Sequence, residues 1–164
     1  MNGKAKVVMV MGTASDVGKS VVATALCRIL TQDGWQVAPF KAQNMSLNSF
    51  AVPDRGEIGR AQVVQAEVAR VTPTVDVNPV LLKPVADHRS QVPVLGTPMV
   101  MKSAAEYYEM KPKLWPVVTG ALDRLRDEYD VAVIEGAGSP AEINLKAQEI
   151  VNMSVAKYAD AAVI

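Results

Sequence analysis

A lysine and a serine follow the second of two glycines in residues 12–20, whose sequence is GTASDVGKS. Glycine lets the backbone approach an anion closely, and the N–H groups at a helix start point toward it. The lysine ammonium would neutralise β- and γ-phosphates, and the serine hydroxyl would bind Mg²⁺. We therefore predict that the phosphates of ATP are held by Gly12, Thr13, Ala14, Ser15, Asp16, Val17, Gly18, Lys19 and Ser20.

The spacing of this segment departs from the common phosphate-binding loop, because five residues instead of four separate Gly12 from Gly18. Its context nevertheless agrees with that loop. Residues 7–11 form a short apolar run typical of a buried strand, and after Ser20 apolar residues recur at helical spacing until Asp33. The alternative is a turn that only caps a helix, and the Gly-Lys-Ser ending between strand and helix favours phosphate binding.

Three further charged residues are candidates for the same site. Glu135 ends the apolar strand pattern of residues 130–135, where a carboxylate can bind Mg²⁺ directly or through water, or cap a helix. Lys41 follows a second predicted strand, residues 35–40, and is either a ligand of the transferred phosphate or a surface lysine. Asp16, inside the loop, can bind Mg²⁺, act on the substrate or cap the helix.

Alternating strands and helices predict an α/β fold of the P-loop NTPase type, with three α/β/α layers around a mainly parallel sheet. Strands are expected at residues 7–11, 35–40, 130–135 and 161–164, and helices after residue 20 and at 58–71, 103–110, 114–129 and 148–158. Residues 41–56 lack a clean period and predict a long loop. Five prolines between residues 73 and 98 leave room only for short elements, and Ser139 and Glu142 have the spacing of a capping box.

The composition limits the classes of partner and location. The chain has 164 residues, the size of one domain, with 17 basic and 17 acidic residues. This balance gives no electrostatic case for nucleic acid or an anionic membrane. No apolar run approaches the roughly 18 residues that a membrane helix needs. The single cysteine, Cys27, cannot form an internal disulfide and is expected to pack in the core, which favours a reducing, cytoplasmic location.

Residues 136–141, GAGSPA, imitate the Gly-x-Gly-x-x-Ala fingerprint of dinucleotide-binding folds. That fingerprint normally occupies the first strand-to-helix turn of its domain. Here residues 12–20 already take that place, so we disfavour dinucleotide binding.

The extra residue in the phosphate loop makes the loop similar to those of the dethiobiotin synthetase-like branch of P-loop proteins. Four further segments, in order along the chain, resemble the cobyric acid synthase family. They are APFKAQNMSLNS (residues 38–49), GEIGRAQ (56–62), NPVLLKP (78–84) and EGAGSPAEINL (135–145). The resemblance covers most of the chain, although Arg55 stands where we would expect a glycine.

This resemblance implies an ATP-dependent carbon–nitrogen ligase of the glutamine amidotransferase type in cobalamin biosynthesis. The family amidates four corrin side-chain carboxylates, converting adenosylcobyrinic acid a,c-diamide to cobyric acid, and we expect an acyl phosphate intermediate. Ammonia comes from glutamine in a carboxy-terminal amidotransferase domain. We therefore expect residues 1–164 to be the ATP-binding synthetase domain of a longer protein. Its partners would be the corrin substrate and glutamine-derived ammonia, with a homodimer as a candidate assembly and neither nucleic acid nor membrane as a partner.

Phosphoryl transfer needs positioning and charge neutralisation more than covalent chemistry. We assign that neutralisation to Lys19 and Lys41, and we take Asp16 as a third catalytic candidate. The candidates for binding Mg²⁺ are Ser20, Asp16, Glu135 and, by resemblance to carboxylates that follow the second strand in related domains, Glu57.

Two alternative functions stay open. One is another dethiobiotin synthetase-like enzyme, either a cobyrinic acid a,c-diamide synthase or a dethiobiotin synthetase, although residues 43–45 and 78–84 argue against both. The other is a partition-type ATPase that switches partners with its nucleotide state. Such switches carry an additional lysine early in the loop, where this sequence has Ala14, so we disfavour that alternative.

Overall fold

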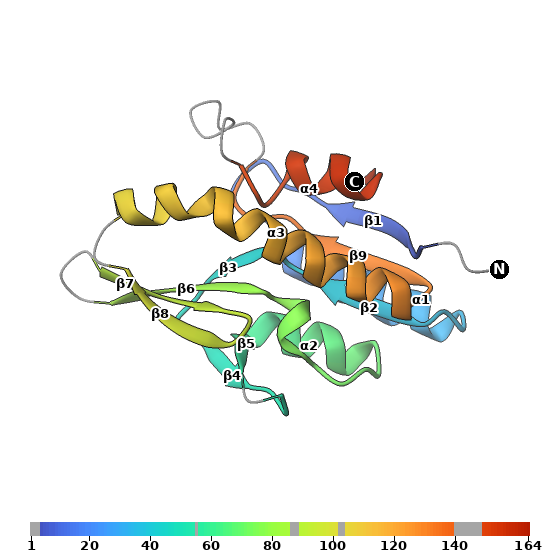
Figure 1. The fold of residues 1–164 in the computed structure, drawn as a ribbon. Helices are drawn as coiled ribbons and strands as arrows, with labels where there is room; N and C mark the ends of the chain where they lie inside the picture. The colour runs from blue at the N-terminus through green and yellow to red at the C-terminus, as the bar shows by residue number, and fades with distance from the viewer. Residues whose placement is uncertain (1–3, 55, 86–88, 102–103, 140–148) are drawn as a thin grey trace.

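A sheet of four parallel strands forms the centre of the molecule, in the order β10-β1-β9-β2 (Figure 1). The computed structural model describes residues 4–54, 56–85, 89–101, 104–139 and 149–164. The strands of the central sheet are β1 (Lys6–Val10), β2 (Val37–Phe40), β9 (Val131–Glu135) and β10 (Ala162–Val163). Each coincides with a strand predicted from the sequence, with bounds that differ by one or two residues.

Helices cover both faces of this sheet, as the three-layer prediction requires. They are α1 (Lys19–Gln32), α2 (Arg60–Val68), α3 (Ala104–Glu128) and α4 (Met153–Ala159). Successive strand side chains point to opposite faces. On β1, Met9 packs in a buried cluster with Leu122 of α3, and Val10 packs in a second cluster with Cys27 of α1. The α/β/α fold and the core position of Cys27 are therefore confirmed.

A second four-stranded sheet accounts for the proline-rich middle of the chain. It has the order β3-β6-β7-β8, in which β3 is parallel to β6 and the other neighbours are antiparallel. Its strands are β3 (Gln43–Met45), β6 (Val80–Val85), β7 (Arg89–Val94) and β8 (Thr97–Met101), and a 3-10 turn, η1, spans Val75–Val77. A separate antiparallel pair joins β4 (Ser49–Ala51) to β5 (Glu57–Gly59).

Three predictions of local structure were wrong in part. Residues 41–56 are not one long loop, because they contain β3 and β4, which at three residues each are too short to show a period. The helix predicted for 58–71 begins at Arg60, since the preceding residues pair as β5. The last predicted helix begins at Met153 instead of residue 148. The helical turn predicted after Ser139 lies outside the described residues.

Residues 104–128 form a single helix, whereas the sequence predicts two helices interrupted near Pro112. Pro112 and Pro116 each remove one N–H donor from the helix. Leu114, Val118 and Leu122, which lie on both sides of Pro116, nevertheless pack in the main core. Tertiary packing of this apolar stripe therefore keeps α3 continuous.

The register of the parallel sheet positions the site. Val10 of β1 pairs with Glu135 of β9, and Phe40 of β2 pairs with Ile134 of β9. The residues that follow β1 and β2 therefore leave the sheet at the edge where β9 ends. Ligands of open α/β sheets bind at this edge.

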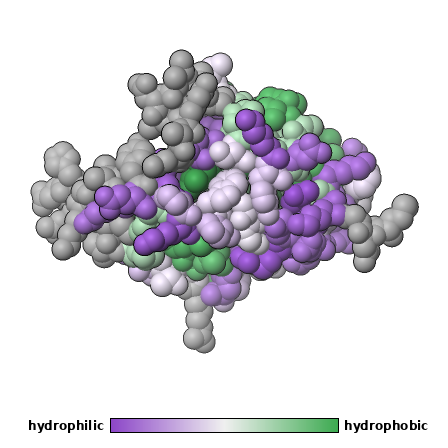
Figure 2. Space-filling model, turned by 45° about the horizontal axis from the view of Figure 1, so that its top comes forward, coloured by the Kyte–Doolittle hydropathy of each residue, from purple (hydrophilic) through white to green (hydrophobic). Residues whose placement is uncertain are grey.

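Among the described residues on the face drawn in Figure 2, hydrophilic and intermediate residues separate the apolar ones. Within the described ranges, no helix combines the length and the apolar character that crossing a membrane requires.

Candidate functional site

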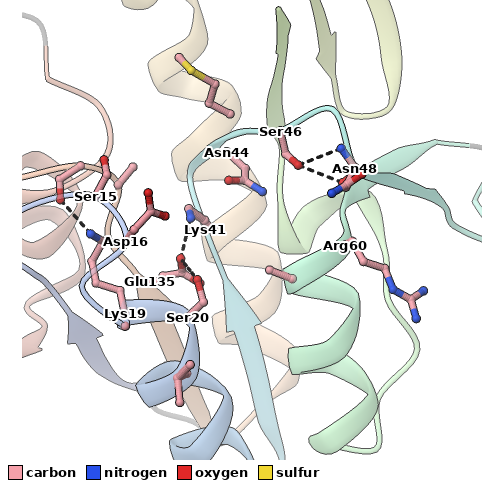
Figure 3. Close-up of a pocket in the computed structure, with 16 residues that line it drawn as sticks. Ser15, Asp16, Lys19, Ser20, Lys41, Asn44, Ser46, Asn48, Arg60 and Glu135 are labelled. Carbon is pink, nitrogen blue, oxygen red and sulfur yellow. Dashed lines mark hydrogen bonds and ion pairs between the residues drawn. The ribbon is translucent and has the colours of Figure 1, made fainter.

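A pocket of about 530 Å³ lies at the carboxyl edge of the central sheet (Figure 3). The loop before α1, the ends of β2 and β9, residues 44–48 and the start of α2 line it. Five predicted residues meet there, namely Asp16, Lys19, Ser20, Lys41 and Glu135. Ser15 and Gly18 also line the pocket. The other predicted loop residues, Gly12, Thr13, Ala14 and Val17, belong to the loop without lining this cavity.

The loop owes its shape to its two glycines. Gly18 has a φ of 96°, a left-handed conformation that turns the chain into α1. A Cβ atom on Gly12 would lie 2.6 Å from Val17 Cγ2 and 3.0 Å from Lys19 Cγ, so a larger residue would force the loop open. In the described part of the chain, no side chain forms a capping hydrogen bond at the start of α1. The helix start therefore keeps its positive dipole end available for an anion.

The Lys19 ammonium lies beneath this loop. Lys19 is only 8% exposed, and its Nζ donates hydrogen bonds to the backbone oxygen of Ala14 at 2.5 Å and of Gly138 at 3.0 Å. Two separate turns therefore hold the cation by neutral carbonyl groups. Because no carboxylate pairs with Lys19 in the described part of the chain, its charge remains available to a bound phosphate.

Glu135 is the most buried charged group of the pocket, at 1% exposure. Its Oε1 accepts hydrogen bonds from the Ser20 hydroxyl at 2.7 Å and from Lys41 Nζ at 2.6 Å, and both side chains point at it in Figure 3. Its Oε2 accepts hydrogen bonds from the side-chain amides of Gln65 at 2.6 Å and Gln62 at 3.3 Å. Buried carboxylates require such partners, because desolvation of an unpaired charge is costly.

The donors of this pocket fit a magnesium ion held together with a nucleotide. Mg²⁺ prefers oxygen ligands and usually takes one or two from the protein, completing its shell with water and phosphate oxygens. The Ser20 hydroxyl and Glu135 Oε1 are two such oxygens on one wall of the pocket. No cluster of three or more acidic, histidine or cysteine side chains occurs among the described residues, so an all-protein metal cage is absent from them.

Lys41 is positioned by its backbone as well as by Glu135. Its N–H donates to Val77 O at 2.8 Å, and its carbonyl accepts a hydrogen bond from Asn78 Nδ2 at 3.0 Å. Asn78 is 1% exposed and also accepts the N–H of Gly59 at 3.0 Å. This one amide therefore joins the end of β2 to the start of α2. Sequence reasoning singled out Asn78 only as part of a longer segment.

Two of the predicted metal ligands, Asp16 and Glu57, are not held at the buried Ser20–Glu135 contact. Asp16 is exposed in the loop with a φ of 57° and lines the pocket. Glu57 does not line it, because its Oε2 lies 2.5 Å from Lys83 Nζ and accepts the Ser49 hydroxyl at 2.9 Å. Burial alone would raise the pKa of Glu57, but the hydrogen bonds from Lys83 and Ser49 and the Lys83 charge together lower it. The structure thus does not bring Glu57 to Ser20 and Glu135.

Asn152 is a site residue that sequence reasoning missed. It is 3% exposed, and its Oδ1 accepts the N–H of Ala137 at 3.0 Å while its Nδ2 donates to Ala137 O at 2.8 Å. This pair of bonds fixes the turn after β9, whose Gly138 carbonyl holds Lys19. Ala137 and Gly138, which belong to the imitated dinucleotide fingerprint, line the pocket together with the phosphate loop. Nothing in the local sequence around Asn152 indicates this contact.

Gln65 was also missed, and Gln62 was singled out only as the last residue of the segment 56–62. They lie three residues apart on α2, and both are fully buried at 0% exposure. Residues three apart lie on the same face of a helix. The spacing of the two glutamines beside the apolar Ala66 could therefore have indicated that both lie on the buried face of α2.

Comparison with known proteins gives one family of nucleotide-binding domains and relatives that share one name. Residues 8–161 match the family model described as the CobQ/CobB/MinD/ParA nucleotide binding domain. The chain is 58% identical over its full length to a cobyric acid synthase of Dehalococcoides mccartyi strain 195, and 62% identical over 96% of its length to one of Sorangium cellulosum. It is 57% identical over 98% of its length to the cobyric acid synthase of Moorella thermoacetica.

The matched region is only part of each relative. It makes up 32% of the Dehalococcoides protein, 30% of the Sorangium protein and 31% of the Moorella protein. The chain therefore spans about a third of the length of these curated relatives, and it corresponds to their amino-terminal part.

Proposed function

The chain belongs to the CobQ/CobB/MinD/ParA nucleotide-binding domain family, and from that premise we propose that it is the ATP-binding synthetase part of a cobyric acid synthase. In this role it activates corrin side-chain carboxylates for amidation in cobalamin biosynthesis. Relatives named cobyric acid synthase, at 57–62% identity along nearly the whole chain, support the assignment. The convergence of Lys19, Ser20, Lys41 and Glu135 on one pocket carries the chemical part of the proposal.

The reaction needs ATP because a carboxylate is a poor electrophile toward ammonia. Attack of the carboxylate oxygen on the γ-phosphorus forms an acyl phosphate and releases ADP. Ammonia then attacks the acyl carbon, inorganic phosphate leaves with the C–O electron pair, and loss of a proton from nitrogen gives the amide. The protein must orient the two substrates and stabilise the charge on the transferred group.

Named residues of the pocket suit each of these tasks. Lys19, held by neutral carbonyls, can turn its ammonium to the β- and γ-phosphates. Lys41 can neutralise charge on the transferred phosphoryl group, and Asp16 lies in the loop beside it as the third catalytic candidate. Ser20, Glu135 and Asp16 would hold Mg²⁺, which supplies Lewis-acid neutralisation of the phosphate oxygens when bound. Glu57 would join this set only if β5 moved, because Lys83 pairs with it.

The remaining substrates and the setting follow from the same proposal. The acid substrate is adenosylcobyrinic acid a,c-diamide. The ammonia derives from glutamine that a separate amidotransferase domain hydrolyses. A reducing cytoplasm suits the free thiol of Cys27. Homodimer formation is part of this proposal and is testable by sedimentation.

The direct test is ATP turnover by the purified protein with ammonium chloride as the nitrogen source. We expect ADP formation to require the corrin acid, and mass spectrometry to show its conversion to amides. Dethiobiotin precursor in place of the corrin acid should give no turnover. ATP turnover that is independent of both acids and is stimulated only by a protein or membrane partner would instead indicate a switch ATPase.

A further inference from the structure

The buried face of α2 carries two glutamines where apolar side chains would be expected. Gln62 and Gln65 are both fully buried, and their neighbours Val63 and Ala66 are buried as well. Glutamine is seldom excluded from water so completely, because its amide loses hydrogen bonds to solvent. Two such residues on one short helix therefore need a specific partner.

That partner is a single oxygen of Glu135. The amides of Gln65 and Gln62 donate to Oε2 at 2.6 Å and 3.3 Å, whereas Ser20 and Lys41 donate to Oε1. The two carboxylate oxygens thus have separate sets of partners. Because Oε2 is tied to α2, rotation of the carboxylate is restrained and Oε1 stays directed at the pocket.

Gln65 holds this orientation at a cost to stability. Its own Oε1 is buried and has no hydrogen-bond partner among the described residues. A buried carbonyl without a partner destabilises the folded state. Turning the amide over would place this oxygen against Glu135 Oε2, where two acceptors would repel each other. Buried polar atoms normally have hydrogen-bond partners, and exceptions occur mainly at functional sites.

The neutral charge of these amides is also significant. Lys41 already places one ammonium 2.6 Å from Glu135 Oε1, and a lysine in place of Gln65 would add a second positive charge that repels a metal cation. An amide restrains and stabilises the carboxylate while leaving its negative charge in place. The Gln62 carbonyl in turn accepts Asn44 Nδ2 at 2.9 Å, and Asn44 lines the pocket.

We propose that Gln65, with a smaller contribution from Gln62, is a positioning residue that holds Glu135 Oε1 in place to bind the magnesium ion of the nucleotide. This inference rests on the proposed function, because it assumes that a magnesium nucleotide occupies the pocket. It differs from a purely structural role in one respect. Loss of the Gln65 amide should weaken the magnesium-dependent part of nucleotide binding and spare the rest.

The test measures binding of a non-hydrolysable ATP analogue, AMP-PNP, by calorimetry, once with Mg²⁺ and once with EDTA. The ratio of the two dissociation constants reports the gain from the metal. We expect Gln65→Met to reduce this ratio about tenfold, as for loss of a hydrogen bond to a charged group. Gln62→Met should reduce it less, about threefold, because its bond is longer. Gln32→Met, an exposed glutamine at the end of α1, is the matched control and should leave the ratio unchanged.

The outcomes separate the inference from the proposed function. A Gln65→Met protein that keeps the full magnesium gain, or that loses affinity equally with Mg²⁺ and with EDTA, would overturn the inference alone. No magnesium gain in the unaltered protein would overturn the proposed metal site itself. If Gln65→Met fails to fold, as judged by circular dichroism, an unchanged ratio in Gln62→Met overturns the inference and a reduced ratio supports it.

Discussion

The Lys41 ammonium lies 2.6 Å from Glu135 Oε1, and this ion pair joins the end of β2 to the end of β9. The Ser20 hydroxyl, from the first turn of α1, reaches the same oxygen at 2.7 Å. One carboxylate oxygen thus connects three elements that are distant in sequence. Because neighbouring parallel strands end at the same edge, the sheet itself brings these residues together.

The ion pair leads to a prediction about stability. Lys41→Met leaves Glu135 buried without its cation, which should lower the free energy of unfolding by about 3 kcal/mol, as for other broken buried pairs. Adding Glu135→Gln to this variant removes the unpaired charge and should restore part of the loss. Urea unfolding in EDTA measures both proteins. If the free energy of unfolding of Lys41→Met lies within about 0.5 kcal/mol of that of the unaltered chain, the ion pair contributes little to stability.

Lys19 is predicted to be essential for nucleotide binding and dispensable for folding. Lys19→Ala removes the ammonium that faces the phosphates and should weaken AMP-PNP binding about 100-fold or more, by analogy with other charge-stabilising groups in phosphoryl transfer. ATP-dependent amidation should be abolished. Calorimetry and thermal unfolding provide the two readouts, and Lys157→Ala, an exposed lysine on α4, is the control. Amidation activity that survives the substitution would refute the assignment.

Asn152 should act on the loop through the turn that it fixes. Asn152→Ala leaves the N–H and the carbonyl of Ala137 without their partners, which should cost about 1–3 kcal/mol of stability. The part of the pocket wall that Ala137 and Gly138 form would then be less well ordered, so we expect AMP-PNP affinity to fall as well. Asn152→Asp, which would place a buried carboxylate against the Ala137 carbonyl, should be at least as destabilising as Asn152→Ala in urea unfolding at pH 7. Equal stability of all three proteins would argue against the bridging role.

The pair Glu57–Lys83 predicts a dependence of stability on pH. The pKa of Glu57 lies below its ordinary value of 4.5 in the folded protein, so the unfolded chain binds the proton more readily. The contribution of Glu57 is therefore present above about pH 4.5 and is lost as the pH falls through the lower, folded value.

Both partners are partly exposed, so this contribution should be only about 1 kcal/mol. We expect Glu57→Gln to destabilise the protein by that amount at pH 7 and by much less near pH 3. Urea unfolding at the two pH values measures the difference, with the exposed Glu67→Gln of α2 as the control. An effect that is the same at both values would contradict the ionic origin of the stabilisation.

The central part of the site was predictable because it depends on a short sequence motif and on the geometry of a parallel sheet. A glycine-rich turn between strand and helix positions Lys19 and Ser20, and parallel strands that end together bring Lys41 and Glu135 to the same edge. The rest depends on packing that has no local signal. Glu57 of β5 contacts Lys83 of β6, 26 positions further along the chain, and Asn152 contacts Ala137, 15 positions before it.

The helix prediction failed at α3 for a related reason. Pro112, which lies between the two helices expected at 103–110 and 114–129, has an unfavourable local preference in a helix interior. The cost of its missing hydrogen bond is outweighed by burial of Leu114, Val118 and Leu122, and this compensation is visible only after folding. For Gln62 and Gln65, the helical spacing was visible, but their partner Glu135 lies 70 or more positions away in the chain.

A crystal structure of the protein with Mg²⁺ and AMP-PNP would show whether residues 12–20 bind the nucleotide. We expect the triphosphate inside this loop, with Lys19 Nζ moved from the carbonyls of Ala14 and Gly138 to the phosphates, and Mg²⁺ beside Ser20 and Glu135. A nucleotide bound elsewhere, with Lys19 still on both carbonyls, would contradict this expectation.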